Sequence, residues 1–507
     1  MRRPVLALVA LSTVLAVLAP VQAEASTTFS RVHASVTHTS MTVTLKSLGS
    51  GWRYRLYAST AKPDVYSGNL TNGRARHSAL ASRPRMSISS MTYTTKVYWY
   101  KILATKGSSK RYSPIYSVSL TPNVPSQVAV TSNSGQGTSL TWVNGAVTGL
   151  SVQRADDAAF TTNVVSYSLR HNSQQLSPFG LVNGATYYFR VRAMNGSTGS
   201  AYSAAVSTTA QSNEQSVRVG TYNLNNAQSG APAASWSQRR VAGASLVNEA
   251  APDLLGVQEA SNWVSKSSHN YVTGVSCPAT TAWRQVDDFV AALGGTYQLA
   301  PTEIAPCSGP GWFRGANYIL YNPRTYTVVD AGHFVIDTIN GVEKWAPWAV
   351  MQNIATGARL LFVAPHITVD MSSPNINWDQ RRQTETTSLI QQAQQVAANN
   401  GNLPIVYAGD FNSNSKHTLD GPAVAMRAAH NEDAEYGAQS LTNFKYDSAN
   451  KYMRTPPAFS DDIDHVFMAP GVSPRGWKLW MHMSNGQLVG TIPSDHNLLT
   501  ADVNFPY

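Results

Sequence analysis

Near residue 216 the chain changes from one hydrophobic pattern to another. Before it, short alternating strands rich in Thr, Val and Tyr are separated by Gly, Asn and Ser turns, with no helical period. After it, apolar runs of strand length alternate with helical stretches, and the clearest helices are predicted at 236–248 and 378–399, the second stopped by Gly401. At roughly 100–200 residues per domain, a chain of 507 residues is expected to hold about three domains. We therefore predict β-sandwich modules followed by one α/β domain at 215–507.

The β-only part contains an internal repeat. The segment Tyr98–Ala104 reads Tyr-Trp-Tyr-Lys-Ile-Leu-Ala, and Tyr187–Ala193 reads Tyr-Tyr-Phe-Arg-Val-Arg-Ala, about 89 residues later. Prolines near residue 122 mark the joint between the two copies. We expect two β-sandwich modules, at 28–122 and at 125–212.

The second module resembles a fibronectin type III domain. It shares with that family the strand Leu140-Thr141-Trp142, with its buried aromatic residue, and the run from Asn183 to Ala193. The first module shares the later strands but has no clear counterpart of Trp142. We describe it as fibronectin type III-like.

The net charge of +10 is unevenly distributed along the chain. Residues 31–122 carry 14 Lys and Arg against the single acid Asp64, which gives +13, and residues 125–212 carry four against two. From 215 onward 18 basic residues face 23 acidic ones, which gives −5. Since Lys and Arg neutralise phosphates, residues 31–122 are expected to contact nucleic acid, the cell envelope or another polyanion.

The N-terminus has the pattern of a secretory signal peptide. Two arginines precede an apolar run from Val5 to Leu18, and small residues follow, so residues 1–25 are predicted to be removed near Ala23 or Ala25. The run is shorter than the roughly 20 apolar residues of a spanning helix, and no later segment approaches that length. We expect a secreted, extracellular protein without a transmembrane segment, and a monomer.

The two cysteines, Cys277 and Cys307, suit one disulfide in an oxidising compartment, with two buried thiols as the alternative. The closed loop of about 30 residues would be stabilised by roughly 3–4 kcal/mol. Trp312 and Phe313 follow in a Gly- and Pro-rich stretch. They suit either ordinary loop packing or an exposed membrane wedge.

Polar residues recur where the apolar strands of the last domain end. The set is Asn223, Glu259, His366, Asp410, Asn412, Asp464, Asp495 and His496. Each residue alone reads as a turn or cap residue. Their order along the chain carries more weight, because strand ends are where α/β proteins place functional groups.

This order resembles the endonuclease/exonuclease/phosphatase superfamily over roughly 217–507. The matching motifs are Thr221-Tyr222-Asn223-Leu224-Asn225, Val257-Gln258-Glu259, Gly409-Asp410-Phe411-Asn412, Ile463-Asp464-His465 and Ser494-Asp495-His496. The resemblance implies an α/β four-layer sandwich of two mixed β-sheets flanked by helices. Asn225 stands where several nucleases of the family carry an acidic residue, so one metal or two stays open.

The resemblance also implies a metal site. Glu259 is the expected primary ligand, with Asn223 and Asp495 completing or orienting its surroundings. The cofactor is expected to be Mg²⁺, with Mn²⁺ or Ca²⁺ as alternatives, because hard divalent cations prefer carboxylate oxygens and water.

The catalytic roles follow from the same resemblance. Asp410 would orient or deprotonate the attacking water, and Asn412 would hydrogen-bond the phosphate or the metal site. His496 would contact the scissile phosphate, with Asp464 fixing its imidazole. His366 would act on the leaving-group side.

We expect a secreted metal-dependent phosphodiesterase, an extracellular nuclease with nucleic acid as its substrate. The alternative is a sphingomyelinase-type or other phospholipid or inositol-phosphate phosphohydrolase. A third reading is a non-catalytic envelope-binding protein, which the retained costly carboxylates argue against. Endo- or exonucleolytic cleavage stays open.

Overall fold

The structure is a computed structural model that describes residues 29–59, 74–79, 84–89, 91, 97–134, 137–145, 147–171, 173–260, 262–275, 281–302, 316–371, 376–459 and 462–507. The predicted signal peptide, both cysteines, Trp312 and Phe313 lie outside these residues and stay predictions. The chain divides into two compact units, Met1–Pro122 with Asn195–Thr198, and Asn123–Met194 with Gly199–Tyr507. Among the described residues, no helix is long and apolar enough to cross a membrane.

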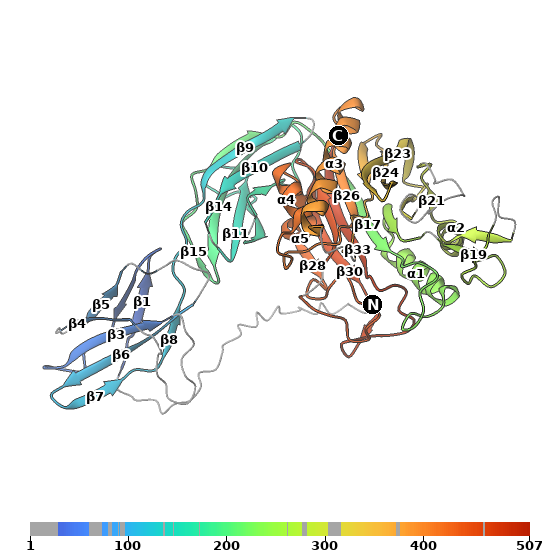
Figure 1. Cartoon of the computed structure of the whole chain (residues 1–507). Helices are drawn as coiled ribbons and strands as arrows, with labels where there is room; N and C mark the ends of the chain where they lie inside the picture. Colours follow the sequence, from blue (N-terminus) through green and yellow to red (C-terminus); the bar gives the residue numbers. More distant parts are fainter. Residues whose placement is uncertain are drawn as a thin grey trace, which may run out of the picture. The chain divides into compact units, whose positions relative to one another are not determined.

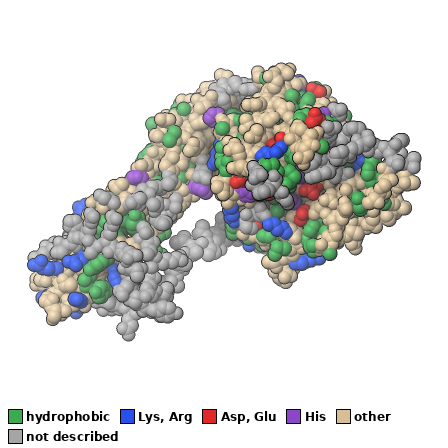
Figure 2. Space-filling view, in the orientation of Figure 1, with side chains coloured by type: hydrophobic (Ala, Val, Ile, Leu, Met, Phe, Trp, Pro, Cys, Tyr) green, Lys and Arg blue, Asp and Glu red, His purple; other side chains and the backbone are tan. Residues whose placement is uncertain are grey.

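The first unit consists of two antiparallel sheets around an apolar core. One sheet has the order β1(His33–Val36)-β2(Met41–Thr44)-β5(Arg85–Ile88), and the other β4(Arg74–Ala79)-β3(Arg53–Ser59)-β6(Tyr98–Lys106)-β7(Ser109–Tyr112), with β8(Tyr116–Val118) paired to β6. Along β3, Tyr54 and Leu56 are buried in the core while Arg53 and Arg55 are exposed. On the face that Figure 2 shows, Lys and Arg side chains lie on this unit, and Asp and Glu side chains lie on the second together with further Lys and Arg.

The second unit begins with another two-sheet sandwich (Figure 1). Its sheets are β13(Gln175–Leu176)-β10(Gly137–Val143)-β9(Ser126–Ser134) and β12(Val165–Arg170)-β11(Gly149–Ala155)-β14(Thr186–Asn195)-β15(Thr198–Gly199), with β16(Val206–Thr209) paired to β14. Trp142 lies in the core with Leu150 and Phe189, and its indole nitrogen donates to the Ser173 carbonyl at 3.0 Å. Whether this sandwich is a fibronectin type III domain stays a prediction.

The remainder contains two mixed β-sheets. The first is β21(Gln298–Leu299)-β22(Tyr318–Tyr321)-β18(Leu254–Gln258)-β17(Glu214–Asn223)-β33(Leu498–Pro506)-β30(Ser473–Trp480)-β28(Ser440–Thr442). The second is β23(Tyr326–Ile339)-β24(Val342–Asn353)-β25(Arg359–Val363)-β26(Ile405–Asp410)-β29(Asp464–Met468)-β27(Glu432–Asp433). Two short hairpins, β19(Trp263–Ser265)-β20(Ala282–Arg284) and β31(Met483–Ser484)-β32(Gln487–Leu488), complete the strands.

Helices cover the outer faces of both sheets. α1(Trp236–Ala250) and α2(Gln285–Ala292) share an apolar core with the first sheet, and α3(Trp378–Asn399) and α4(Gly421–Ala428) share another with the second. A third core lies between the sheets. The short α5(Ala434–Gly437) follows β27. The layers are therefore helix, sheet, sheet and helix, the α/β sandwich that the motifs implied.

Local signals account for the helix ends. The Asn377 side chain accepts a hydrogen bond from the Gln380 amide at 3.0 Å, which caps α3, and Gly401 follows the helix at a φ of +92°. The helix predicted at 236–248 runs two residues further, to Ala250, and ends where Ala251 takes a left-handed conformation.

Candidate active site

The predicted site residues stand at the ends of strands from both sheets. Asn223 ends β17, Glu259 follows β18, His366 follows β25, Asp410 ends β26 with Asn412 just beyond, Asp464 begins β29, and Asp495 and His496 precede β33. Most of them contact one another, so the ends of six strands converge on one cluster.

Two glycines let the strands approach closely enough for this. A Cβ on Gly256 of β18 would lie 2.7 Å from the Ala408 carbonyl oxygen of β26, in the facing sheet. A Cβ on Gly409 would lie 2.1 Å from the Pro365 carbonyl oxygen, closer than any real contact. Because neither glycine has a side chain, the carboxylate-bearing ends of β18 and β26 can meet.

Asn223 bridges the two sheets. Its Nδ2 donates to Glu259 Oε1 and to Asp410 Oδ2, each at 3.0 Å. Its Oδ1 accepts from the Asn225 amide at 2.9 Å, which fixes the orientation of the side chain. Glu259 itself has a φ of +60°, an uncommon conformation for a side-chain-bearing residue.

His496 is held by Asp464. Its Nδ1 lies 2.7 Å from Asp464 Oδ2, and its Nε2 lies 3.8 Å from Asp410 Oδ2. Burial alone would lower the pKa of His496, but the charges of Asp464 and Asp410 outweigh it and raise the pKa well above its ordinary value. His496 is therefore an imidazolium, with Nε2–H directed at the centre of the cluster.

Asp410 occupies that centre. Burial, reinforced by the charge of Asp464, raises its pKa to about 7, against the opposing effects of His496 and of hydrogen bonds from Asn223 and the Asn412 amide. A carboxyl group with a pKa near neutrality is matched to taking up a proton at physiological pH.

His366 lies on the other side of Asp410. Its Nε2 is 3.6 Å from Asp410 Oδ2 and 4.0 Å from Glu259 Oε1. Burial lowers its pKa well below the ordinary value, and the positive charges of Lys344 and His496 lower it further. The two histidines beside Asp410 thus differ in charge: His366 is neutral and His496 is positive.

The residues present fit a divalent cation. Asp410 and Asp464 lie beside the imidazolium of His496, Glu259 joins them through Asn223, and buried Asp464 Oδ1 accepts no hydrogen bond from the described residues. Buried negative charge without a partner is costly, so this excess favours a bound cation. The Glu259 side chain is 34% exposed, which leaves room for the water that Mg²⁺ retains.

The acidic and histidine ligand atoms that lie closest together differ from the predicted metal set. Within the described residues, one group of His, Cys, Asp or Glu has all its ligand atoms within 4.8 Å, namely Asp410, Asp464 and His496. Asp495 is connected to the cluster through Ser494, whose Oγ lies 3.2 Å from Asp495 Oδ1 and 2.6 Å from the Asn223 carbonyl oxygen.

Sequence reasoning missed the side chains that hold these loops. Arg239 of α1 is only 1% exposed and donates to the carbonyls of Leu224, Asn226 and Pro493 at 2.8, 2.8 and 3.1 Å. It thereby ties the segments after Asn223 and before Asp495 to one helix. An arginine in a helix reads as a surface residue, so no sequence signal pointed to it.

Ser448 plays a similar part for Asp464. Its Oγ accepts hydrogen bonds from the amides of Ile463 and Asp464, at 2.9 and 3.0 Å. A single serine in a loop carries no sequence signal for this contact.

No family model matches the sequence, and no curated protein matches it. Several solved structures are similar to the chain. An endonuclease/exonuclease/phosphatase family protein from Bacteroides thetaiotaomicron is 18% identical, with a TM-score of 0.44 over 58% of this chain and 99% of that one. A mannosyl-6-phosphatase from the same organism is 18% identical, with a TM-score of 0.43 over 57% and 99%. The human Nocturnin catalytic domain is 15% identical, with a TM-score of 0.39 over 58% and 97%.

Proposed function

We propose that this chain is a secreted, metal-dependent hydrolase of phosphodiesters in nucleic acid. The observation that carries the proposal is the cluster around Asp410. There a carboxyl group with a pKa near 7 lies between a neutral and a charged histidine, beside the half-exposed carboxylate Glu259.

The residues divide the chemistry of ester hydrolysis between them. Asp410 takes the proton of the attacking water, since its pKa allows it to bind a proton near neutral pH. His496 donates its Nε2–H to a phosphoryl oxygen, and Asp464 holds the imidazolium in position from behind. Neutral His366 can donate a ring N–H hydrogen bond to the leaving oxygen, without transferring its proton.

A divalent cation, when bound, would neutralise charge on the phosphoryl group. Glu259 is the residue that would hold it, with Asp495 as a further ligand, and Asn223 would orient the carboxylates through its Nδ2. Asn412 donates its Nδ2 to the Ile367 carbonyl at 2.9 Å, and so keeps the segment after His366 against the Asp410 loop.

Nucleic acid is the preferred substrate because the first unit displays a basic sheet face. Two rows of residues cross β3, β6 and β7 on one face of the sheet. One row is Arg53, Thr105 and Lys110, and the other is Arg55, Leu103 and Tyr112. Arg53, Arg55, Lys110 and Tyr112 are all exposed. Proteins bind single-stranded nucleic acid with cationic side chains that contact the phosphates and with aromatic rings that stack on the bases.

The test is a substrate panel. The purified chain is incubated with duplex and single-stranded DNA, RNA, sphingomyelin dispersions, phosphoinositides and bis(p-nitrophenyl) phosphate, with Mg²⁺, Mn²⁺ or Ca²⁺ and with chelator. We expect metal-dependent cleavage of nucleic acid to exceed cleavage of either lipid. Preferential turnover of a lipid would refute the substrate assignment, and no turnover of any phosphate ester would refute the enzyme assignment.

A further inference from the structure

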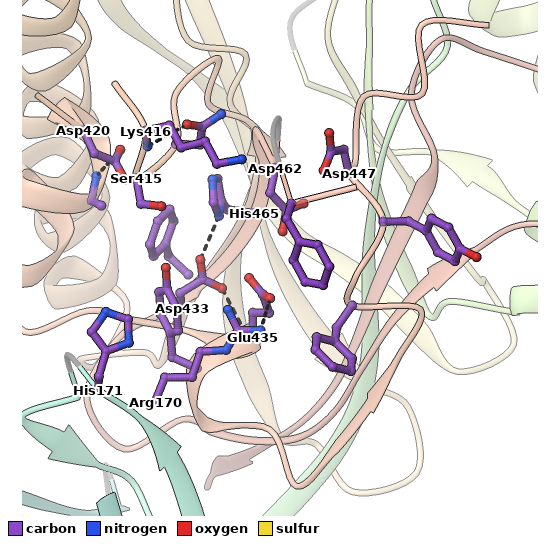
Figure 3. A pocket seen from close by; sticks show the side chains of 17 residues that line it. Arg170, His171, Ser415, Lys416, Asp420, Asp433, Glu435, Asp447, Asp462 and His465 are labelled. Carbon is purple, nitrogen blue, oxygen red and sulfur yellow. Dashed lines mark hydrogen bonds and ion pairs between the residues drawn. The ribbon is translucent and has the colours of Figure 1, made fainter. Parts of the chain in front are cut away.

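A second cavity lies outside the catalytic cluster, where the second sandwich meets the outer face of the six-stranded sheet. It has a volume of about 440 Å³ and is lined by both parts, with Arg170 from β12 and Asp433, Glu435, Asp462 and His465 from the α/β sandwich (Figure 3).

Strand β29 separates this cavity from the catalytic cluster. Val466 and Met468 belong to the core between the sheets, whereas Phe467 belongs to the core on the outer face. Side chains alternate along a strand, so Asp464 faces the catalytic cluster and His465 faces the cavity.

The two parts of the second unit are joined firmly around this cavity. Arg170 Nη2 lies 2.5 Å from Glu435 Oε1, and the Gly471 amide donates to Ser139 Oγ and Ser177 Oγ, each at 3.0 Å. The Arg170–Glu435 ion pair thus joins the two walls of the cavity directly.

The cavity lining carries an excess of negative charge. Its acids are Asp420, Asp433, Glu435, Asp447 and Asp462, and its Lys, Arg and charged His side chains are Arg170, Lys416 and His465. His465 is fixed as a cation, because its Nδ1 lies 2.7 Å from Asp433 Oδ2 and its Nε2 lies 3.1 Å from the Ser413 carbonyl. Counted as five carboxylates and three cations, these eight groups have a formal balance of −2. Burial and the neighbouring acids raise the pKa of Asp462 well above its ordinary value, so a cation beside it would favour its charged form.

Asp462 is the carboxylate that this pairing leaves over. Glu435 pairs with Arg170, Asp433 pairs with His465, Asp420 caps α4, and Asp447 has an interaction of its own. Asp462 Oδ1 is buried and accepts no hydrogen bond from the described part of the chain. A buried acceptor of this kind calls for a donor that the protein itself does not provide.

Aromatic side chains line the mouth of the cavity. Phe444 is 45% exposed and Phe459 is 66% exposed, although both are large apolar residues. The backbone of Phe459 has a φ of +56°, which is unfavourable for a residue with a side chain. Its amide donates to the Lys445 carbonyl at 3.2 Å, and this hydrogen bond holds the backbone there. Strain and apolar exposure at one place are typical of a contact surface for a ligand.

We propose that this cavity binds an organic cation, with an amine or quaternary ammonium group directed at Asp462 and its carbon framework against Phe444 and Phe459. A bare metal ion fits less well. The lining acids and His465 do not form a group with ligand atoms within 4.8 Å of one another among the described residues, and 440 Å³ is the size of a small-molecule pocket. Aromatic rings beside a carboxylate are the usual surroundings of an ammonium group.

Binding to the full chain, measured by calorimetry, tests this proposal without any substrate, so its failure is separate from failure of the proposed function. The probes are benzylamine and choline, with benzyl alcohol as the uncharged match of benzylamine, and Mg²⁺ or Ca²⁺ alone. We expect at least one cation to bind and benzyl alcohol to bind at least roughly tenfold more weakly. Equal binding of benzyl alcohol, or binding of the metal ions only, would overturn the proposal.

Variants locate the site. Asp462→Asn keeps the shape but removes the charge, and it should weaken binding roughly 10- to 100-fold, the range for a charged hydrogen bond. Asp330→Asn, an exposed acid on β23, is the matched control and should bind as wild type does. Phe459→Ala changes a mostly exposed ring, so it should fold and still weaken binding by roughly 3- to 30-fold. If Asp462→Asn and Phe459→Ala both bind as wild type does, the cavity is not the site.

Discussion

We predict that Asp464→Asn, which removes the charged contact between Asp464 and His496, lowers kcat by two to three orders of magnitude. The two groups are 2.7 Å apart, and Asp464 is almost fully buried. With charge centres about 4 Å apart and an effective dielectric constant of about 20, the attraction is about 4 kcal/mol. Asparagine can still accept the Nδ1 hydrogen bond, so mainly this charge term is lost. A loss of about 3–4 kcal/mol corresponds to a roughly 10²- to 10³-fold fall in kcat.

The assay is steady-state hydrolysis of bis(p-nitrophenyl) phosphate, with the melting temperature measured for each variant. Asp464 acts through His496, so kcat should fall while KM changes less than about threefold. Asp288→Asn is the matched control, because Asp288 Oδ1 also lies 2.7 Å from a histidine Nδ1, that of His269, away from the site. The control should lose stability but keep its kcat. Equal kcat losses in the two variants would refute a specific role for Asp464.

Three further changes test other parts of the structure. Gly409→Ala forces a Cβ against the Pro365 carbonyl oxygen, so we expect a loss of about 1–3 kcal/mol in stability and a loss of activity of at least tenfold; unchanged melting and turnover would contradict the close approach. Burial and a neighbouring carboxylate raise the pKa of Glu432 to about 8. As pH rises from about 5 to 8, wild type should therefore lose up to about 4 kcal/mol of stability relative to Glu432→Gln. A difference in melting temperature between the two proteins that is constant with pH would argue against this. Replacing Arg53 and Arg55 by serine should weaken binding of long DNA and reduce the salt slope by roughly 1.5–2, while kcat on the small diester stays as it is; an unchanged slope would show that this face does not hold DNA.

Features that depend on local sequence were predictable. The helix at 378–399 has the predicted bounds, because each end has its own local signal, the Asn377 cap at the start and Gly401 just past the end. The site residues could be listed for the same reason: each is a polar residue where an apolar strand ends.

Features that depend on distant segments were not predictable. Burial, then the charge of Lys344, lowers the pKa of His366, whereas the charges of Asp464 and Asp410 raise that of His496, and all of these groups lie on distant segments. His465 pairs with Asp433, on another strand, and the cavity beside it is closed by Arg170 of the second sandwich. Nothing near His465 in the sequence indicates either partner.

The central claim is that Glu259 holds a divalent cation on which hydrolysis depends. The most direct measurement is the rate of bis(p-nitrophenyl) phosphate hydrolysis by wild type and Glu259→Gln, before chelation, after it, and after Mg²⁺ is restored. Wild type should lose its activity with chelator and regain it with Mg²⁺. Glu259→Gln should stay at least about 10²-fold slower throughout, a loss of about 3 kcal/mol or more. Activity that survives chelation, or a folded Glu259→Gln variant with near wild-type turnover and verified metal content, would contradict the account.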